Sequence, residues 1–276
     1  MIVNNISCAL LLVGHIRDSL NNDILSNALS EFKKSFIRCD IFVHTWATYE
    51  ANSIMPLHAL YDTKLGNEAI NENDLLSYIN PTKYIIEKQD ESLLNDNEEY
   101  FFMCKVPRVS MKFIYYSIWK AYTLSKTYSE ENNIKYDIVI RIRPDFYKFP
   151  YTANINNLKQ VITEIKKYKN MKNYITGFFH RPDTALGDNY FFLHYEDGDI
   201  FLKAINNDYS TICDENGCIS QEEVMHICLN NLKFKSIAAI PKGSYPDFNQ
   251  WVKKNNVTKR LICSFLDKIK NAIDKF

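Results

Sequence analysis

Short apolar runs alternate with amphipathic segments along most of this 276-residue chain, and this alternation restricts the possible folds more than any other feature. Runs rich in β-branched and aromatic residues predict strands, and apolar residues at helical spacing predict helices. We expect strands at 7–14, 39–46, 82–88, 136–143, 173–179, 189–195 and 233–241. We expect helices at 21–36, 71–80, 110–132, 155–168, 220–232 and 257–275. The pattern predicts an α/β fold with a mostly parallel, Rossmann-type sheet and helices on both faces.

One large domain can accommodate a chain of this length, and no internal repeat or low-complexity linker divides it. We therefore expect one domain over residues 1–245, followed by a C-terminal helix within residues 246–276. That tail combines an apolar helical face with several lysine and arginine residues. Such a helix suits the surface of an anionic membrane, while packing against the domain is the commoner alternative.

The charge balance and the apolar runs exclude two broad classes of protein. Lysine plus arginine equals aspartate plus glutamate, 33 against 33, which argues against a nucleic-acid-binding protein. The longest early apolar run, 8–13, is too short to span a bilayer and lacks the basic start of a signal peptide. We expect a cytoplasmic protein, with peripheral contact at the inner face of the membrane through the tail helix as an addition.

Three polar clusters follow three of the expected strands, at the point where each strand ends. The first is Gly14-His15-Ile16-Arg17-Asp18, the second is His44-Thr45-Trp46, and the third is Arg141-Ile142-Arg143-Pro144-Asp145. In open α/β sheets, ligands bind beyond the carboxyl ends of the parallel strands. The three clusters therefore predict one binding site at this edge of the sheet.

The third cluster has the most distinctive pattern. Arg141, Arg143 and Asp145 occupy alternate positions, so an extended strand would point them the same way. Arginine offers a planar fork of donors for phosphate or carboxylate, and the aspartate can hold a metal, a ribose hydroxyl or one of the arginines. A structural network of ion pairs that caps the strand is the alternative. We favour a ligand site, because charges inside such a strand are costly unless paired or used.

The first two clusters are less specific. Gly14 allows a close approach of the backbone, and Arg17 brings a cation to a phosphate, but a plain turn fits the same residues. His44 can bind substrate, and Trp46 can stack on a base or a sugar. A half-buried histidine and a core tryptophan explain that pair equally well.

Two carboxylates are candidates for catalysis. Asp188 comes just before the strand expected at 189–195, where it either takes the proton of an acceptor hydroxyl or belongs to a turn. Glu222 lies in the first turn of the helix expected at 220–232, where the helix dipole favours its ionised form. Its neighbour Glu223 has the spacing of a capping box with Ser220 and is expected to be structural.

Six segments, in this order, resemble bacterial and viral glycosyltransferase-like proteins of surface-polysaccharide gene clusters. They are LLVGHIRDS, CDIFVHTW, SMKFIYYSIWKAYTL, YDIVIRIRPDF, GDNYFF and SQEEVMHICL. The resemblance covers about Ser7 to Ile240, and YDIVIRxRPD is its most specific element. It implies a nucleotide-diphospho-sugar transferase with a GT-A-like fold.

In that fold an aspartate motif after a central strand usually holds a divalent metal and the donor diphosphate. Asp145 matches this position, so the resemblance implies a Mn or Mg ion there. Arg143 stands where the common Asp-x-Asp pattern has its first aspartate, which makes neutralisation by Arg141 and Arg143 the alternative. The resemblance also implies a catalytic carboxylate at the start of a helix. Glu222 is similar in placement, and Asp188 is its rival.

We therefore expect a glycosyltransferase that moves a sugar from a nucleotide-diphospho-sugar donor to a surface polysaccharide or lipopolysaccharide acceptor. The residues expected to bind the donor are Gly14, His15, Arg17, His44, Trp46, Arg141, Arg143 and Asp145. One alternative is a nucleotide-dependent transferase of a sugar phosphate or an alditol phosphate. Another is a non-catalytic component of a glycan-assembly complex.

Overall fold

Seven strands form one sheet in the order β3-β2-β1-β4-β6-β5-β7 in the computed structural model, which describes residues 5–17, 19–21, 23–49, 68–89, 108–145, 155–181, 185–216 and 221–238. The strands are β1 (Ser7–Val13), β2 (Arg38–Trp46), β3 (Lys83–Glu87), β4 (Ile138–Ile142), β5 (Tyr174–Arg181), β6 (Ala185–His194) and β7 (Lys235–Ala238). The helices are η1 (Ser19–Asn21), α1 (Asp23–Ser35), α2 (Glu72–Ile79), α3 (Arg108–Glu131), α4 (Ile155–Tyr168), α5 (Tyr195–Asn216) and α6 (Gln221–Asn231).

The sheet is mixed but mostly parallel. Strand β6 pairs antiparallel with both β4 and β5, whereas the pairings of β1 with β2, β1 with β4, β2 with β3 and β5 with β7 are parallel. The strands β3, β2, β1 and β4 therefore lie side by side and end at the same edge of the sheet. We call this the carboxyl edge.

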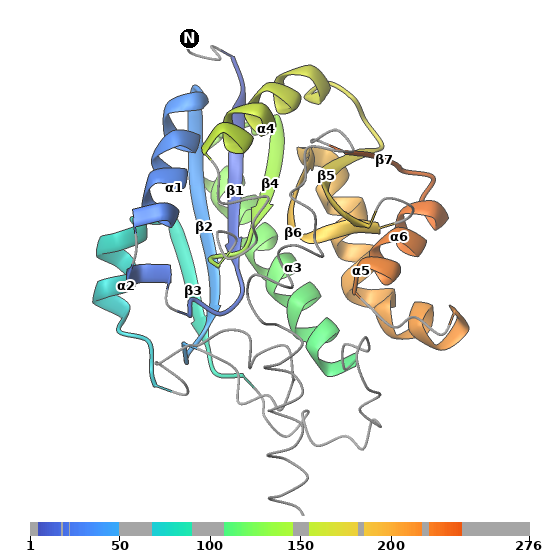
Figure 1. Ribbon diagram of the computed structural model, residues 1–276, viewed down its shortest axis with the longest axis horizontal. Coiled ribbons are helices and arrows are strands. Elements are labelled where there is room, and N and C mark those ends of the chain that lie inside the picture. Colours follow the sequence, from blue (N-terminus) through green and yellow to red (C-terminus); the bar gives the residue numbers. More distant parts are fainter. Residues whose placement is uncertain are drawn as a thin grey trace, which may run out of the picture.

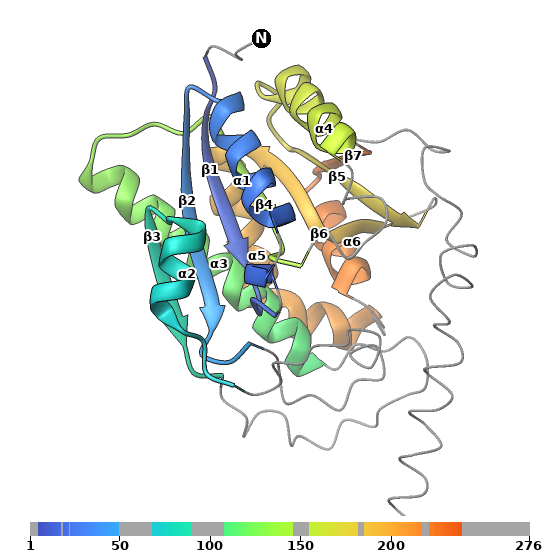
Figure 2. The same cartoon turned by 60° about the vertical axis from the view of Figure 1, so that its left-hand side comes forward.

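Helices cover both faces of the sheet (Figures 1 and 2). Buried side chains of α1, α2 and α4 pack against one face, where β1 contributes Leu10 and Leu12. Buried side chains of α3, α5 and α6 pack against the other face, where β1 contributes Leu11 and Val13. Successive strand residues point to opposite faces, so a strand that is buried on both sides must be apolar throughout. That requirement explains the continuous run SCALLLV in β1.

The predicted α/β class, the mostly parallel sheet and the helices on both faces are confirmed. The expected elements within the described ranges are present; the helix at 155–168 has the expected bounds, and the other elements have shifted ends. Helix α5, with 22 residues, is not among the elements expected from the sequence. Its first turn contains the pair Asp197-Gly198, and its middle is rich in Asn, Asp, Ser and Thr, which are typical of turns. Buried apolar residues of α5 nevertheless pack against α3 and the sheet.

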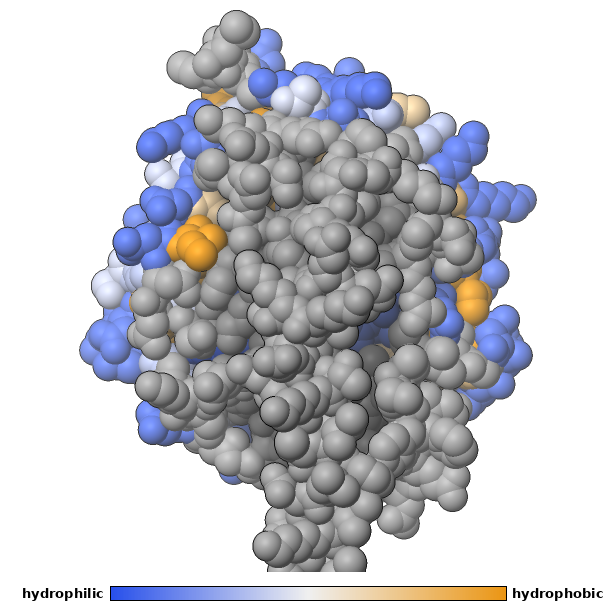
Figure 3. All heavy atoms as spheres, viewed as in Figure 1, coloured by the Kyte–Doolittle hydropathy of each residue, from blue (hydrophilic) through white to orange (hydrophobic). Residues whose placement is uncertain are grey.

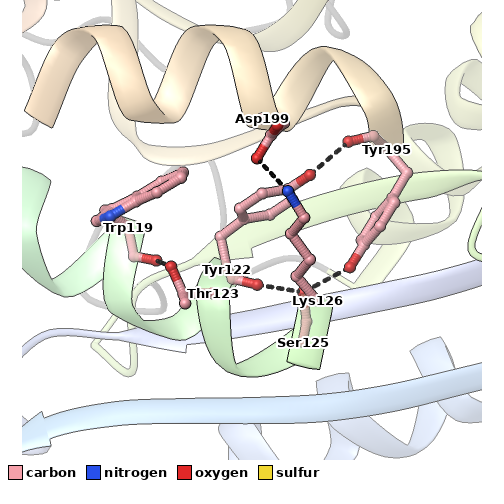
Figure 4. Close-up of polar contacts among 7 residues, drawn as sticks. All are labelled: Trp119, Tyr122, Thr123, Ser125, Lys126, Tyr195 and Asp199. Carbon is pink, nitrogen blue, oxygen red and sulfur yellow. Dashed lines mark hydrogen bonds and ion pairs between the residues drawn. The ribbon is translucent and has the colours of Figure 1, made fainter. Parts of the chain in front are cut away.

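Helix α5 is fixed to α3 by a set of polar contacts (Figure 4). The hydroxyl of Tyr122 donates to the backbone oxygen of Tyr195 at 3.0 Å, and the hydroxyls of Ser125 and Tyr195 are 2.9 Å apart. The ammonium of Lys126 lies 2.9 Å from the carboxylate of Asp199. Gly198 allows the close approach, since a Cβ there would lie 2.7 Å from the ring of Tyr122.

Several predictions concern residues outside the described ranges. They are the tail helix at 257–275, the boundary between 1–245 and 246–276, and the role of Ser220 in a capping box. None of the helices in the described ranges is long and apolar enough to cross a membrane. The described part of the surface in Figure 3 is mainly hydrophilic, with isolated apolar residues.

Candidate functional site

The three polar clusters meet at the carboxyl edge, because β2, β1 and β4 are adjacent and parallel. The backbone N–H of Gly14 donates to the backbone oxygen of His44 at 3.2 Å, which joins the first cluster to the second. Gly14 has a backbone φ of 114°, a value that residues with a Cβ atom rarely adopt. The sharp change of direction after β1 therefore depends on glycine.

Asp145 joins the first cluster to the third. Its carboxylate accepts from Nε and Nη2 of Arg143 at 2.9 and 3.0 Å, in a two-point pairing. It also forms an ion pair with Nη1 of Arg17 from the loop after β1. The backbone of Arg17 is left-handed, with a φ of 53°, and its N–H donates to the backbone oxygen of Tyr49 at 2.8 Å. One buried carboxylate thus holds two guanidinium groups in place.

The two arginines keep Asp145 ionised. Burial alone would raise the pKa of Asp145, but the charges and hydrogen bonds of Arg143 and Arg17 outweigh it and hold the pKa well below its ordinary value. Arg17 and Asp145 are buried, while Arg143 keeps 18% of its side chain exposed. Of this group, Arg143 is the side chain best placed to touch a ligand.

Asp145 does not by itself fit a divalent metal. Both of its oxygens accept from guanidinium donors. A Mn or Mg ion prefers several oxygen ligands around it. The described residues contain no group of three or more histidine, cysteine, aspartate or glutamate side chains that could hold an ion. The sequence left several alternatives for Asp145, among them a metal and an arginine partner. The structure shows Asp145 paired with arginine.

Arg141 lies inside β4 rather than after it. It is 2% exposed, and its backbone pairs with Leu11 of β1 and Phe191 of β6. Its neighbour Val139 packs on the face covered by α3, α5 and α6, and alternation places Arg141 on that face too. A ligand that reaches the carboxyl edge would meet Arg143 before Arg141.

Trp46 is a core residue, as the structural alternative expects, and His44 is fully buried rather than half-buried. His44 is 0% exposed and Trp46 is 5% exposed. The Trp46 ring packs against the rings of His44, Phe113 and Tyr116. The distances between the ring centroids are 5.1, 5.2 and 6.1 Å, in that order. The Tyr116 ring is stacked on Trp46 at an interplanar angle of 18°, where a base or a sugar would otherwise stack. The His44 and Phe113 rings are nearly perpendicular to Trp46. The ring centroids of His15 and Trp46 are 6.4 Å apart, and His15 is half-buried.

Sequence reasoning missed a second group of polar side chains at this edge. Glu87, the last residue of β3, accepts from the Tyr116 hydroxyl at 2.8 Å and pairs with Nε2 of His44 at 3.3 Å. Lys120, one turn along α3 from Tyr116, places its ammonium 3.6 Å from the other Glu87 oxygen. The rule about carboxyl ends of parallel strands, applied to the third expected strand, would have found Glu87.

The two candidate catalytic carboxylates lie in elements that reach the same edge. Glu222 is in the first turn of α6, next to Gln221, whose backbone oxygen accepts from the Tyr115 hydroxyl of α3 at 2.7 Å. Asp188 lies inside β6, two residues before Tyr190, which pairs with Ile142 at the end of β4. The expectation that Asp188 precedes the strand is therefore wrong, because β6 begins at Ala185.

Because His44 is buried, we expect the stability of the fold to depend on pH. Burial lowers the pKa of His44 from its ordinary value of 6.5, although the hydrogen bond to Glu87 partly opposes this. The unfolded chain then binds a proton before the folded chain does, so stability is lost as the pH falls below 6.5. We expect His44→Gln to remove part of this loss. Urea denaturation of both proteins over a pH series would measure it, and parallel curves would contradict the prediction.

The described residues thus define an α/β protein with two neighbouring polar groups at the carboxyl edge of a mostly parallel sheet. No protein-family model matches the chain, and no curated protein matches it significantly.

Proposed function

We propose that this protein is a glycosyltransferase that moves a sugar from a nucleotide-diphospho-sugar to a surface polysaccharide or lipopolysaccharide, with a GT-A-like fold. Two observations support the proposal. The sequence segments that carry the resemblance fall on β1, β2, α3, β4, β6 and α6. Arg17, Arg143 and Asp145, from two of those segments, meet at the carboxyl edge, where α/β sheets bind ligands.

The pairing of Arg17 and Arg143 through Asp145 carries the proposal. Guanidinium groups suit phosphate oxygens, and a carboxylate that fixes their orientation removes part of the cost of ordering them. When the bond between the sugar and the diphosphate breaks, negative charge grows on the leaving diphosphate. Donors that are already oriented stabilise this charge without rearrangement. In this proposal Asp145 positions the arginines and Arg143 contacts the diphosphate.

The acceptor side of the reaction needs a base. The acceptor oxygen forms a bond to the anomeric carbon and loses its proton, while the nucleoside diphosphate leaves with the electrons of the broken bond. Glu222 at the start of α6 or Asp188 in β6 would take that proton. A Mn or Mg ion would need ligands in addition to Asp145. If the segment 257–275 forms the helix expected from the sequence, its contact with a membrane surface would bring the enzyme to a lipopolysaccharide acceptor.

The proposal predicts a specific effect of Arg143→Gln. We expect binding of nucleoside diphosphates to weaken about tenfold to a hundredfold, because a charge-assisted contact to phosphate is lost. The measurement is titration calorimetry, followed by transfer or donor hydrolysis with a panel of nucleotide sugars and product mass.

Arg38→Gln is the matched control, because Arg38 also pairs with an aspartate two residues later, Asp40, but at the opposite end of its strand. This variant should bind nucleotides as the wild type does. Equal affinity of the wild type and Arg143→Gln would refute the assigned role. A phosphate retained on the acceptor would indicate a sugar-phosphate or alditol-phosphate transferase instead. Absence of any nucleotide binding by the wild type would favour a non-catalytic component of a glycan-assembly complex.

A further inference from the structure

Glu87 and its partners form a polar group that the diphosphate site does not use. We propose that Glu87 and Lys120 form a diol-binding subsite at the end of β3, which takes two neighbouring hydroxyl groups of the nucleotide sugar. This inference rests on the proposed function, because it takes the ligand to be the donor. The hydroxyls belong either to the ribose or to the transferred sugar, and the two sources share the same chemistry.

The carboxylate of Glu87 is held so that one oxygen is occupied and the other is presented. Oε2 accepts from the Tyr116 hydroxyl at 2.8 Å and from Nε2 of His44 at 3.3 Å. Oε1 faces the ammonium of Lys120 at 3.6 Å, which is longer than a direct hydrogen bond. His44 is buried and Tyr116 is partly buried, so both are rigid supports. Oε1 therefore keeps capacity to accept from a ligand.

The partly exposed pair of opposite charges matches a diol. Glu87 has 29% and Lys120 has 39% of its side chain exposed, so a ligand can reach both groups. A hydroxyl group both donates and accepts hydrogen bonds. One hydroxyl of a diol can donate to Oε1 of Glu87, while its neighbour accepts from Nζ of Lys120. The Glu87 carboxyl is suited to accept, because its pKa is lowered: burial opposes this, but the hydrogen bonds from Tyr116 and His44 outweigh burial.

The distance to the arginines suits a ligand that extends along the sheet edge. Strand β2 lies between β3 and β1. The distance from β3 to β1 is therefore two strand spacings, or roughly 10 Å. Arg17 follows β1, and Arg143 follows β4, one strand further along. A diphosphate alone would not touch both Glu87 and Arg143. A diphosphate joined to a sugar ring would extend toward both groups.

The test compares binding of four probes to the wild type, Glu87→Gln and Lys120→Met. The probes are inorganic pyrophosphate, ribonucleoside diphosphates, their 2′,3′-dideoxy analogues and nucleotide sugars. We expect Glu87→Gln to weaken binding of a probe that carries the recognised diol about tenfold and to leave pyrophosphate binding unchanged. Weaker binding of the ribonucleoside diphosphates and of the nucleotide sugars, without an effect on the dideoxy analogues, assigns the subsite to ribose. An effect confined to nucleotide sugars assigns it to the transferred sugar.

Glu72→Gln is the matched control, because Glu72 also accepts from a tyrosine, Tyr84 at 2.5 Å, but is exposed and outside the group at the carboxyl edge. It should bind every probe as the wild type does. Unchanged binding of all probes by Glu87→Gln would overturn the inference, and so would an equal loss for pyrophosphate, which would indicate a structural role. In either case nucleotide binding by the wild type would leave the proposed function standing. A wild type that binds no nucleotide would overturn both.

Discussion

Replacing Asp145 with alanine should lower the free energy of unfolding by about 3 to 5 kcal/mol, because a buried ion pair loses one partner. Asp145 is 1% exposed and holds both Arg17 and Arg143. Without the carboxylate, Arg17 stays buried beside a second guanidinium, and the two cations repel each other. The loop after β1 would lose the contact that joins it to β4. Urea denaturation of the two proteins would measure the difference.

Asp199→Ala is the matched control for this substitution. Asp199 pairs with Lys126 at 2.9 Å, but about two fifths of each side chain is exposed, at 44% and 42%. Exposed ion pairs contribute roughly 0 to 1 kcal/mol, so the control should change stability little. Equal effects of the two substitutions would contradict the view that Asp145 is a buried anchor. A stable Asp145→Ala protein would also refute the idea that the arginines depend on it for their position.

The arrangement of the sheet could be predicted because its strands are buried on both faces. The runs in β1 and β4 are apolar apart from Ser7 at the start of β1 and Arg141 in β4. Such runs fit a parallel sheet with helices on both sides. Helix α5 could not be predicted in the same way, because its packing against α3 depends on Gly198. In an isolated sequence this glycine indicates a turn.

In the candidate site, too, some features could be predicted from the sequence and others could not. The convergence of Arg17, Arg143 and Asp145 follows from strand order, since the carboxyl ends of neighbouring parallel strands meet. The partner choice of Asp145 does not follow, because the same carboxylate could hold a metal or an arginine. Glu87 and Tyr116 are 29 positions apart, and only the packing of α3 on the sheet brings them together.

Replacing Tyr122 with alanine should cost about 3 to 5 kcal/mol of stability, because a large buried ring is lost. Tyr122 is 1% exposed, lies near Trp119 at a centroid distance of 5.8 Å, and donates to the backbone of Tyr195. Its ring also fills the space beside Gly198. The same contact explains why α5 tolerates a glycine in its first turn, although glycine costs roughly 1 kcal/mol relative to alanine in a helix interior.

Combining Gly198→Ala with Tyr122→Ala separates the contact between the ring and Gly198 from the intrinsic cost of glycine in a helix. In the wild type the added Cβ would lie 2.7 Å from the Tyr122 ring, and overpacking should cost about 1 to 3 kcal/mol despite the gain in helix propensity. With Tyr122 absent, the new Cβ still meets Cγ1 of Val139 at 3.3 Å but no longer the ring, so the substitution should cost clearly less than in the wild type. Ser210→Ala, at an exposed position of α5, should behave alike in both backgrounds. Equal costs of Gly198→Ala with and without Tyr122 would show that the ring does not set the distance between α3 and α5.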